Sequence, residues 1–189
     1  LVAVADFLLS KNPGNTVSNL SSSRALRDIT EKHGGSYSAS AVGEVNVVEL
    51  MKKTKAVIGG EGNGGIIYPG LHYGRDALVG VAFFLSLLVE KDCSTSELRN
   101  QYPRYAMSKN KIQLTEGIDA DLILKKMEEK HKEEEITTID GVKIDFENSW
   151  VHLRKSNTEP IIRIYSEAPD EEAAERLVQL IQDEIKGMA

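Results

Sequence analysis

Residues 153–163 read Leu-Arg-Lys-Ser-Asn-Thr-Glu-Pro-Ile-Ile-Arg, and this stretch decides how the second half of the chain is interpreted. Apolar runs flank it, so its ends are predicted to be two β-strands that pair around a polar loop. Arg154 and Arg163 would then stand at neighbouring strand ends, where both guanidinium groups can reach one tetrahedral anion. Hydroxyl and backbone N–H groups of the loop would supply further donors. The alternative interpretation is an ordinary polar surface turn, because such turns favour Ser and Asn.

A second unusual stretch lies upstream, where residues 59–65 read Gly-Gly-Glu-Gly-Asn-Gly-Gly directly after an apolar run. Glycines let the backbone turn sharply and approach a ligand closely. Glu61 offers acceptors for sugar hydroxyls, and Asn63 offers both a donor and an acceptor. The spacing of a dinucleotide-binding fingerprint is absent, as is the Gly-Lys-Ser/Thr of a P-loop. The alternative here is a mobile glycine turn.

Taken together, the two stretches resemble motifs of the α-D-phosphohexomutase family, which includes phosphoglucomutase, phosphomannomutase and phosphoglucosamine mutase. The pattern Arg-x-Ser-Asn-Thr-Glu-Pro-x-x-Arg is similar to the phosphate-binding loop of the family's last domain. The glycine stretch resembles the sugar-recognition loop of the preceding domain. The resemblance covers nearly the whole chain but only the second half of a complete mutase.

The resemblance implies a role for particular residues. It assigns the non-reacting phosphate of the substrate to Arg154, Ser156, Asn157, Thr158 and Arg163, and the sugar hydroxyls to Glu61, Gly62, Asn63 and Gly64. No catalytic residue and no metal ligand is expected in this chain, because the family's serine loop and Asp-x-Asp-x-Asp metal loop do not occur in it. The string that comes nearest, Asp119-Ala120-Asp121, is predicted to begin a helix.

Four positions depart from the better-known family pattern. The usual loop of the family reads Gly-Glu-x-Ser-Gly-His, and here Asn63 and Gly65 replace its serine and histidine. Some relatives carry the same variant. Ser21 and Glu44 stand where many relatives carry a lysine and a histidine, respectively. The sequence therefore leaves open which hexose is recognised: glucosamine, mannose or glucose.

The helix and strand patterns predict two domains. Residues 1–100 alternate between the two patterns, which indicates an α/β layered domain with a mainly parallel sheet. A short helix and linker follow, and residues 104–189 are predicted to form a smaller α+β domain with an antiparallel sheet. Helices are expected at 1–10, 23–34, 45–53, 75–91, 119–130 and 170–186. Strands are expected at 15–20, 36–40, 56–59, 66–68, 103–108, 111–115, 136–139, 142–146, 149–154 and 161–166.

Composition narrows the possible partners. The net charge of −6 arises entirely after residue 103, where 13 Lys and Arg face 19 Asp and Glu, so nucleic acid is not expected as a partner. The single cysteine, Cys93, forbids an internal disulfide and favours a reducing, cytoplasmic compartment. The longest uncharged run, residues 77–89, is too short to cross a membrane and is predicted to be a buried helix. Because the chain begins inside a helical pattern without methionine, we expect it to be part of a longer protein.

Three functions remain open at this point. The first is the C-terminal half of a phosphohexomutase, which binds a hexose phosphate while preceding domains of the same chain supply the serine and Mg²⁺, with a hexose 1,6-bisphosphate as intermediate. This chain alone would then be inactive. The second is a stand-alone phosphosugar-binding regulatory module. The third is a protein-interaction domain whose arginines meet an acidic partner.

Overall fold

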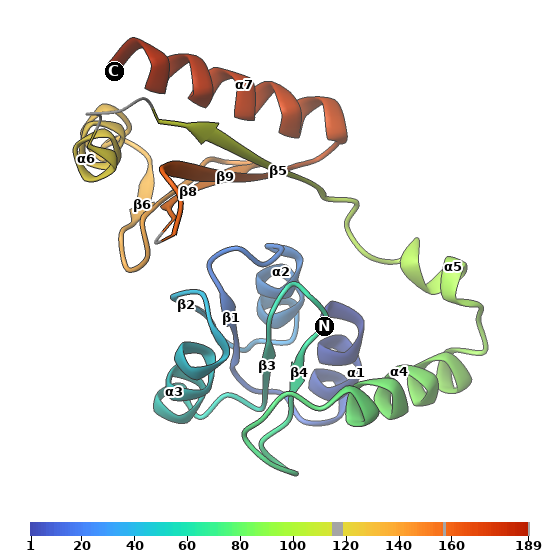
Figure 1. The fold of residues 1–189 in the computed structure, drawn as a ribbon. Helices are drawn as coiled ribbons and strands as arrows, with labels where there is room; N and C mark the ends of the chain where they lie inside the picture. The colour runs from blue at the N-terminus through green and yellow to red at the C-terminus, as the bar shows by residue number, and fades with distance from the viewer. Residues whose placement is uncertain (115–118, 157, 189) are drawn as a thin grey trace. The chain divides into compact units, whose positions relative to one another are not determined.

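The computed structural model describes residues 1–114, 119–156 and 158–188. The chain divides into two compact units, Leu1–Pro103 and Arg104–Ala189 (Figure 1). Each unit has its own sheet and its own apolar core, and each is described separately.

The first unit is built on a four-stranded sheet with the order β2-β1-β3-β4. The central strand β1 (Thr16–Asn19) runs parallel to β2 (Tyr37–Ser40) and to β3 (Ile58–Gly60). The short strand β4 (Ile66–Ile67) returns antiparallel beside β3. The prediction of a mainly parallel sheet is confirmed, and the glycine stretch is the connection between β3 and β4.

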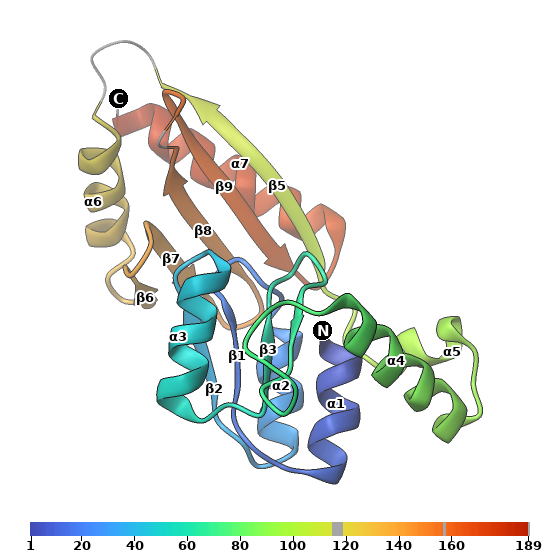
Figure 2. The same cartoon turned by 60° about the horizontal axis from the view of Figure 1, so that its bottom comes forward.

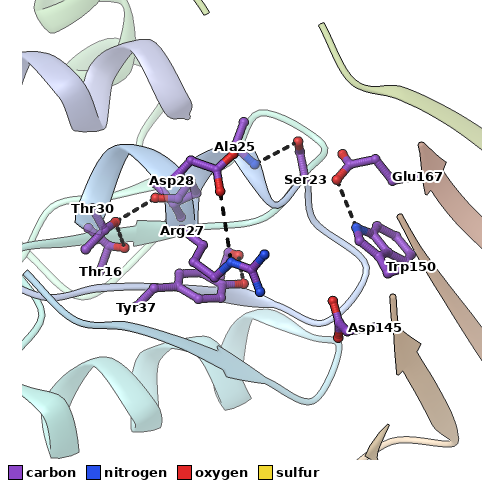
Figure 3. A network of polar contacts seen from close by, with 12 residues as sticks. Thr16, Ser23, Ala25, Arg27, Asp28, Thr30, Tyr37, Asp145, Trp150 and Glu167 are labelled. Carbon is purple, nitrogen blue, oxygen red and sulfur yellow. Dashed lines mark hydrogen bonds and ion pairs between the residues drawn. The ribbon is translucent and has the colours of Figure 1, made fainter. Parts of the chain in front are cut away.

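Helices cover both faces of this sheet. On one face, α1 (Val2–Lys11) and α2 (Ala25–Lys32) pack around Ile58. On the other face, α3 (Glu44–Thr54) packs Val47 and Met51 against Val17. A buried pair of hydroxyls ties the sheet to α2, since Thr16 Oγ1 lies 2.6 Å from Thr30 Oγ1 (Figure 3). A last short helix, α5 (Thr95–Arg99), begins with a capping box in which Ser94 and Glu97 bond reciprocally.

The prediction for residues 77–89 is right about the helix but wrong about its burial. The helix exists as α4 (Ala77–Lys91), with Asp76 as its N-cap, but only Gly80 and Leu87 are buried. One stripe is exposed: Leu78 by 81%, Val81 by 54%, Leu85 by 55% and Val89 by 81%. The opposite side of α4 packs on α1 through residues such as Phe83. An all-round apolar pattern predicts burial only where neighbours exist on every side, and in this chain α4 has them on one side.

The second unit is a five-stranded antiparallel sheet with the order β5-β9-β8-β7-β6. Its strands are β5 (Ala106–Gln113), β6 (Glu135–Thr137), β7 (Val142–Asp145), β8 (Trp150–Lys155) and β9 (Ile161–Ala168). The predicted antiparallel sheet is confirmed, but the two strands expected at 103–108 and 111–115 are one strand, β5. Its polar centre, Ser108-Lys109-Asn110-Lys111, resembles a turn in sequence, yet charged residues of this kind are typical of an edge strand.

Two helices cover one face of this sheet, α6 (Ala120–Lys130) and α7 (Glu171–Met188), as Figure 2 shows. Their apolar stripes meet inward-facing residues of β7, β8 and β9 in a single core: Ile123, Leu124, Met127, Val142, Ile144, Val151, Leu153, Ile162, Ile164, Val178, Ile181 and Ile185. Asp119 is the N-cap of α6, as predicted, because its side chain accepts from the backbone N–H of Asp121. Asp140 and Gly141 lie in the connection between β6 and β7, and Gly141 has a φ of +75°.

The opposite face of the same sheet carries polar side chains. Alternation along β8 places Trp150, His152 and Arg154 on this face, because Val151 and Leu153 point into the core. Trp150 Nε1 donates to Glu167 Oε1 on β9 at 2.9 Å (Figure 3). The residues expected to bind phosphate therefore lie at the end of the face that α6 and α7 leave uncovered.

Candidate functional site

The glycine stretch forms a closed loop at the carboxyl end of β3. The backbone N–H of Glu61 donates to Gly65 O at 3.1 Å, and that of Gly64 donates to Glu61 O at 3.2 Å. A Cβ on Gly60 would lie 2.0 Å from Gly65 O, so only glycine allows this close return of the chain. Gly64 adopts a φ of +91°, which also favours glycine. Gly60 and Gly64 are therefore required by the shape of the loop.

This loop holds the carboxylate of Glu61 in a fixed, buried position. Asn19 Nδ2 donates to Glu61 Oε1 at 2.8 Å, and Arg75 Nη1 lies 3.8 Å from Glu61 Oε2. Asn19 also accepts from the Ser21 backbone N–H and the Ser22 hydroxyl. Because β1 and β3 are parallel, their carboxyl ends meet at one edge of the sheet, which is where such sheets bind ligands. The sequence analysis missed Asn19, although its place at the end of the neighbouring strand was a usable signal.

Arg75 connects the loop to the start of α3. Its Nε donates to Glu44 Oε2 at 2.7 Å, and its backbone N–H donates to Glu44 Oε1 at 3.0 Å. The hydrogen bond from the backbone N–H of Arg75, with help from its guanidinium group, holds the pKa of Glu44 below its usual value. A cavity of about 570 Å³ opens beside these groups, lined by Glu44, Asn63, Gly64, Gly65, Arg75 and Ala77. It offers carboxylate, amide and guanidinium groups to a polyhydroxylated ligand.

Asn63 lies at the tip of the glycine loop. Its Oδ1 accepts from the Gly65 backbone N–H at 3.0 Å, so one side of the amide is already committed to the loop. Gly62 packs near Ser22, where an added Cβ would be at 3.4 Å from the Ser22 Cα. Of the four residues expected to bind sugar, Asn63 and Gly64 line the cavity, and Glu61 and Gly62 precede them in the same loop.

The second candidate loop connects β8 and β9. Arg154 and Arg163 are directly opposite each other in the antiparallel ladder, so both side chains leave the same face of the sheet. The Ser156 backbone N–H donates to Ile161 O at 3.0 Å, and the Thr158 backbone N–H donates to Ser156 Oγ at 3.4 Å. Two arginines and two hydroxyls thus surround one short hairpin connection. Asn157, the fifth expected phosphate ligand, lies outside the described residues.

The cations of this loop differ in their partners. Arg154 Nε is 3.0 Å from Asp140 Oδ2, an ion pair in which the N–H is not aligned to donate. Arg163 is exposed and, among the described residues, lies within ion-pair distance of no carboxylate. Lys155 turns away from both, because its Nζ bonds Asp121 at the start of α6 at 2.6 Å. Of these three cations, Arg163 alone has no carboxylate partner in the described part of the chain.

His152 supports this loop from behind. Its Nε2 is 2.6 Å from Asp140 O, and because a carbonyl can only accept, Nε2 carries the proton. Burial lowers the pKa of His152 to about 4, so the ring is neutral at pH 7. His152 and Arg154 both contact Asp140, which lies in the connection between β6 and β7. The histidine therefore packs behind the loop and does not add a charge to it.

The described part of the chain contains neither a metal-binding cluster nor a membrane-spanning helix. Within residues 1–114, 119–156 and 158–188, no three His, Cys, Asp or Glu side chains gather in a way that could hold a metal ion. Over the same residues, no helix has both the length and the apolar character needed to cross a bilayer. The described residues therefore do not fit a Mg²⁺ site, and no reaction step through a metal is assigned to them.

The first unit is thus a mainly parallel sheet with a glycine loop at the carboxyl end of β3, and the second unit is an antiparallel sheet with an arginine-flanked hairpin. Residues 1–105 match the family profile "Phosphoglucomutase/phosphomannomutase, alpha/beta/alpha domain III", and residues 110–184 match "Phosphoglucomutase/phosphomannomutase, C-terminal domain". The chain therefore belongs to the phosphoglucomutase/phosphomannomutase family, and the resemblance drawn from the two loops is confirmed.

Individual relatives agree with this membership. The chain is similar to a phosphoglucomutase/phosphomannomutase of Thermococcus kodakarensis, with 36% identity over 97% of this chain and 41% of the relative. It is similar to a phosphoglucosamine/phosphogalactosamine mutase of Sulfurisphaera tokodaii, with 36% identity over 94% of this chain and 40% of the relative. A solved family structure from Burkholderia thailandensis superposes with a TM-score of 0.79 at 24% identity, over 99% of this chain and 40% of that one. The chain thus spans about two fifths of the length of the relatives that it matches.

Proposed function

We propose that this chain is the substrate-holding part of a phosphohexomutase that acts on a hexose phosphate, most closely a phosphoglucosamine mutase or a phosphomannomutase. The loop in the second unit binds the non-reacting phosphate through Arg154, Ser156, Asn157, Thr158 and Arg163. The loop in the first unit binds sugar hydroxyls through Glu61, Gly62, Asn63 and Gly64. The observation that carries the proposal is the directly opposed pair of arginines around a hydroxyl-bearing hairpin.

The proposed division of labour follows from what these groups can do. Guanidinium and hydroxyl donors bind a phosphate dianion without reacting with it, and a fixed carboxylate orients hydroxyls. Holding the distant phosphate keeps the sugar in place while its other end meets a phosphoryl donor, which lowers the entropic cost of the transfer. The donor serine and the Mg²⁺ that the family resemblance implies would be supplied by other domains, with a hexose 1,6-bisphosphate as intermediate. The cytoplasmic location expected from the single cysteine stays a prediction.

Titrating the ¹⁵N-labelled chain with inorganic phosphate, glucosamine 6-phosphate and mannose 6-phosphate tests this proposal by NMR. Amide shifts at Ser156 and Thr158 are expected with all three ligands. Shifts at Glu61 to Gly64 are expected only with the two sugars. A preference between the sugars would identify the substrate class.

Paired variants make the test decisive. Arg163→Gln should weaken phosphate binding by at least about tenfold, because one charge-assisted bond contributes about 1.5–3 kcal/mol. Arg176→Gln is the matched control, since Arg176 is an exposed arginine of the same unit that pairs with Glu172 on α7. Equal phosphate affinity for the two variants would refute the phosphate role. Binding of an acidic protein partner without any response to phosphate would instead favour the interaction-domain hypothesis.

A further inference from the structure

A third cation stands in line with the two arginines. Lys111 on the edge strand β5 is directly opposite Arg163 on β9, and Arg163 is directly opposite Arg154 on β8. Residues directly opposite in an antiparallel ladder share a face, so the three side chains form one row across three neighbouring strands. The two ends of this row come from segments more than forty residues apart in the sequence.

The row is short of negative charge. Like charges directly opposite each other destabilise a sheet unless something compensates them. Asp140 compensates Arg154. Within the described part of the chain, neither Lys111 nor Arg163 has a carboxylate oxygen within 4.0 Å of its charged nitrogens. Both side chains are exposed, so the two uncompensated charges face the same open space.

That space is a cavity on the face of the sheet opposite α6 and α7. It has a volume of about 400 Å³ and is lined by Lys109, Lys111, Glu159, Ile161, Arg163 and Tyr165. Lys109 is engaged with the Tyr165 ring, since its Nζ lies 5.6 Å from the ring centroid. Glu159 borders the cavity without forming an ion pair with a described cation. Lys111 and Arg163 are therefore the two cations of the cavity that lie directly opposite each other in the ladder.

We propose that Lys111 is an anion-binding residue of this site and that a phosphate monoester dianion binds between Lys111 and Arg163. The proposal rests on the proposed function and extends it, because the site then includes the edge strand as well as the hairpin loop. A dianion between the two cations cancels their repulsion and joins β5 to β9 by a contact that the free protein lacks. Ligand binding should accordingly protect the β5 amides from hydrogen exchange.

Lys111→Gln removes the charge and keeps most of the side-chain length. At constant ionic strength it should raise the Kd for inorganic phosphate about fivefold, and Lys111→Arg should restore affinity to within about twofold. Lys125→Gln is the control for the change in net charge, because Lys125 is an exposed lysine of α6. The same NMR titration measures all three affinities and reports whether each variant is folded.

The outcomes separate this inference from the proposed function. If Lys111→Gln behaves like Lys125→Gln while Arg163→Gln loses affinity, the role of Lys111 is wrong and the hairpin phosphate site stands. If neither Lys111→Gln nor Arg163→Gln changes phosphate affinity, both proposals are wrong. If Lys111→Gln weakens binding, Lys111→Arg restores it and phosphate slows exchange of the β5 amides, the extended site is supported.

Discussion

Replacing Asn19 by alanine tests how the first unit holds its buried carboxylate. The substitution removes three hydrogen bonds: one to Glu61, one from the Ser21 N–H and one from the Ser22 hydroxyl. A bond to a charged group contributes about 1.5–3 kcal/mol, and a neutral one about 0.5–1.5 kcal/mol. Water can partly replace the two neutral bonds after the truncation, so the expected loss of unfolding free energy is about 3 kcal/mol.

Urea unfolding followed by far-UV circular dichroism measures this loss, with Asn46→Ala as the matched control. Asn46 is an exposed asparagine of the same unit whose Nδ2 donates to Val42 O at 3.0 Å. Its replacement should change the unfolding free energy by less than about 0.5 kcal/mol. If Asn19→Ala costs no more than Asn46→Ala, then Asn19 does not hold Glu61, and the account of the carboxylate as a fixed sugar-binding group loses its structural basis.

Two further predictions concern the backbone of one loop and the ring behind the other. Gly60→Ala should lower the unfolding free energy by about 1–3 kcal/mol, because its Cβ would collide with Gly65 O at 2.0 Å. Gly62→Ala is the control and should be tolerated, because the nearest contact of its Cβ would be at 3.4 Å. Equal losses for the two variants in urea unfolding would refute the close approach. The pKa of His152 is about 4 in the folded chain and has its ordinary value of 6.5 in the unfolded chain. The contribution of His152 to the free energy of unfolding is therefore complete above pH 6.5 and is lost as the pH falls toward about 4. The free energy of unfolding should therefore fall by about 2 kcal/mol between pH 7 and pH 5, and His152→Gln should make it less dependent on pH. If the pH dependence of the variant equals that of the unchanged chain, other groups cause it.

Local chemistry made part of the fold predictable from the sequence. The glycine loop after β3, the N-cap at Asp119 and the turn at Gly141 each depend on residues only a few positions away in the sequence. Features of this kind can be predicted from a short stretch of sequence. The alternation of helix and strand in the first unit has the same origin, since hydrophobic periodicity reports which face of each element is buried. Both candidate loops could be predicted because each is a continuous stretch of sequence between two apolar strands.

Long-range partners explain what the sequence could not predict. The bond between Asn19 and Glu61, the ion pair between Arg154 and Asp140, and the row that includes Lys111 all depend on strand order and register. No local pattern encodes that β5 lies beside β9 and not beside the next strand in the chain. The exposure of one side of α4 could not be predicted for a similar reason. The apolar pattern of a helix shows which of its faces favour burial, but it does not show which segment packs against each face.

The position of β9 in its sheet has a consequence for the kinetics of folding. β9 is the last strand in the chain but lies between β5 and β8, so it must enter between the first strand and a meander of β6, β7 and β8. Pairings that close long loops are slow, because the chain loses entropy before the contacts form. Until β9 arrives, the edge of β8 and the apolar residues of β5 have no partner in the sheet. We expect the second unit to fold in one late, cooperative step, and variants that slow this insertion to aggregate during refolding before they lose equilibrium stability.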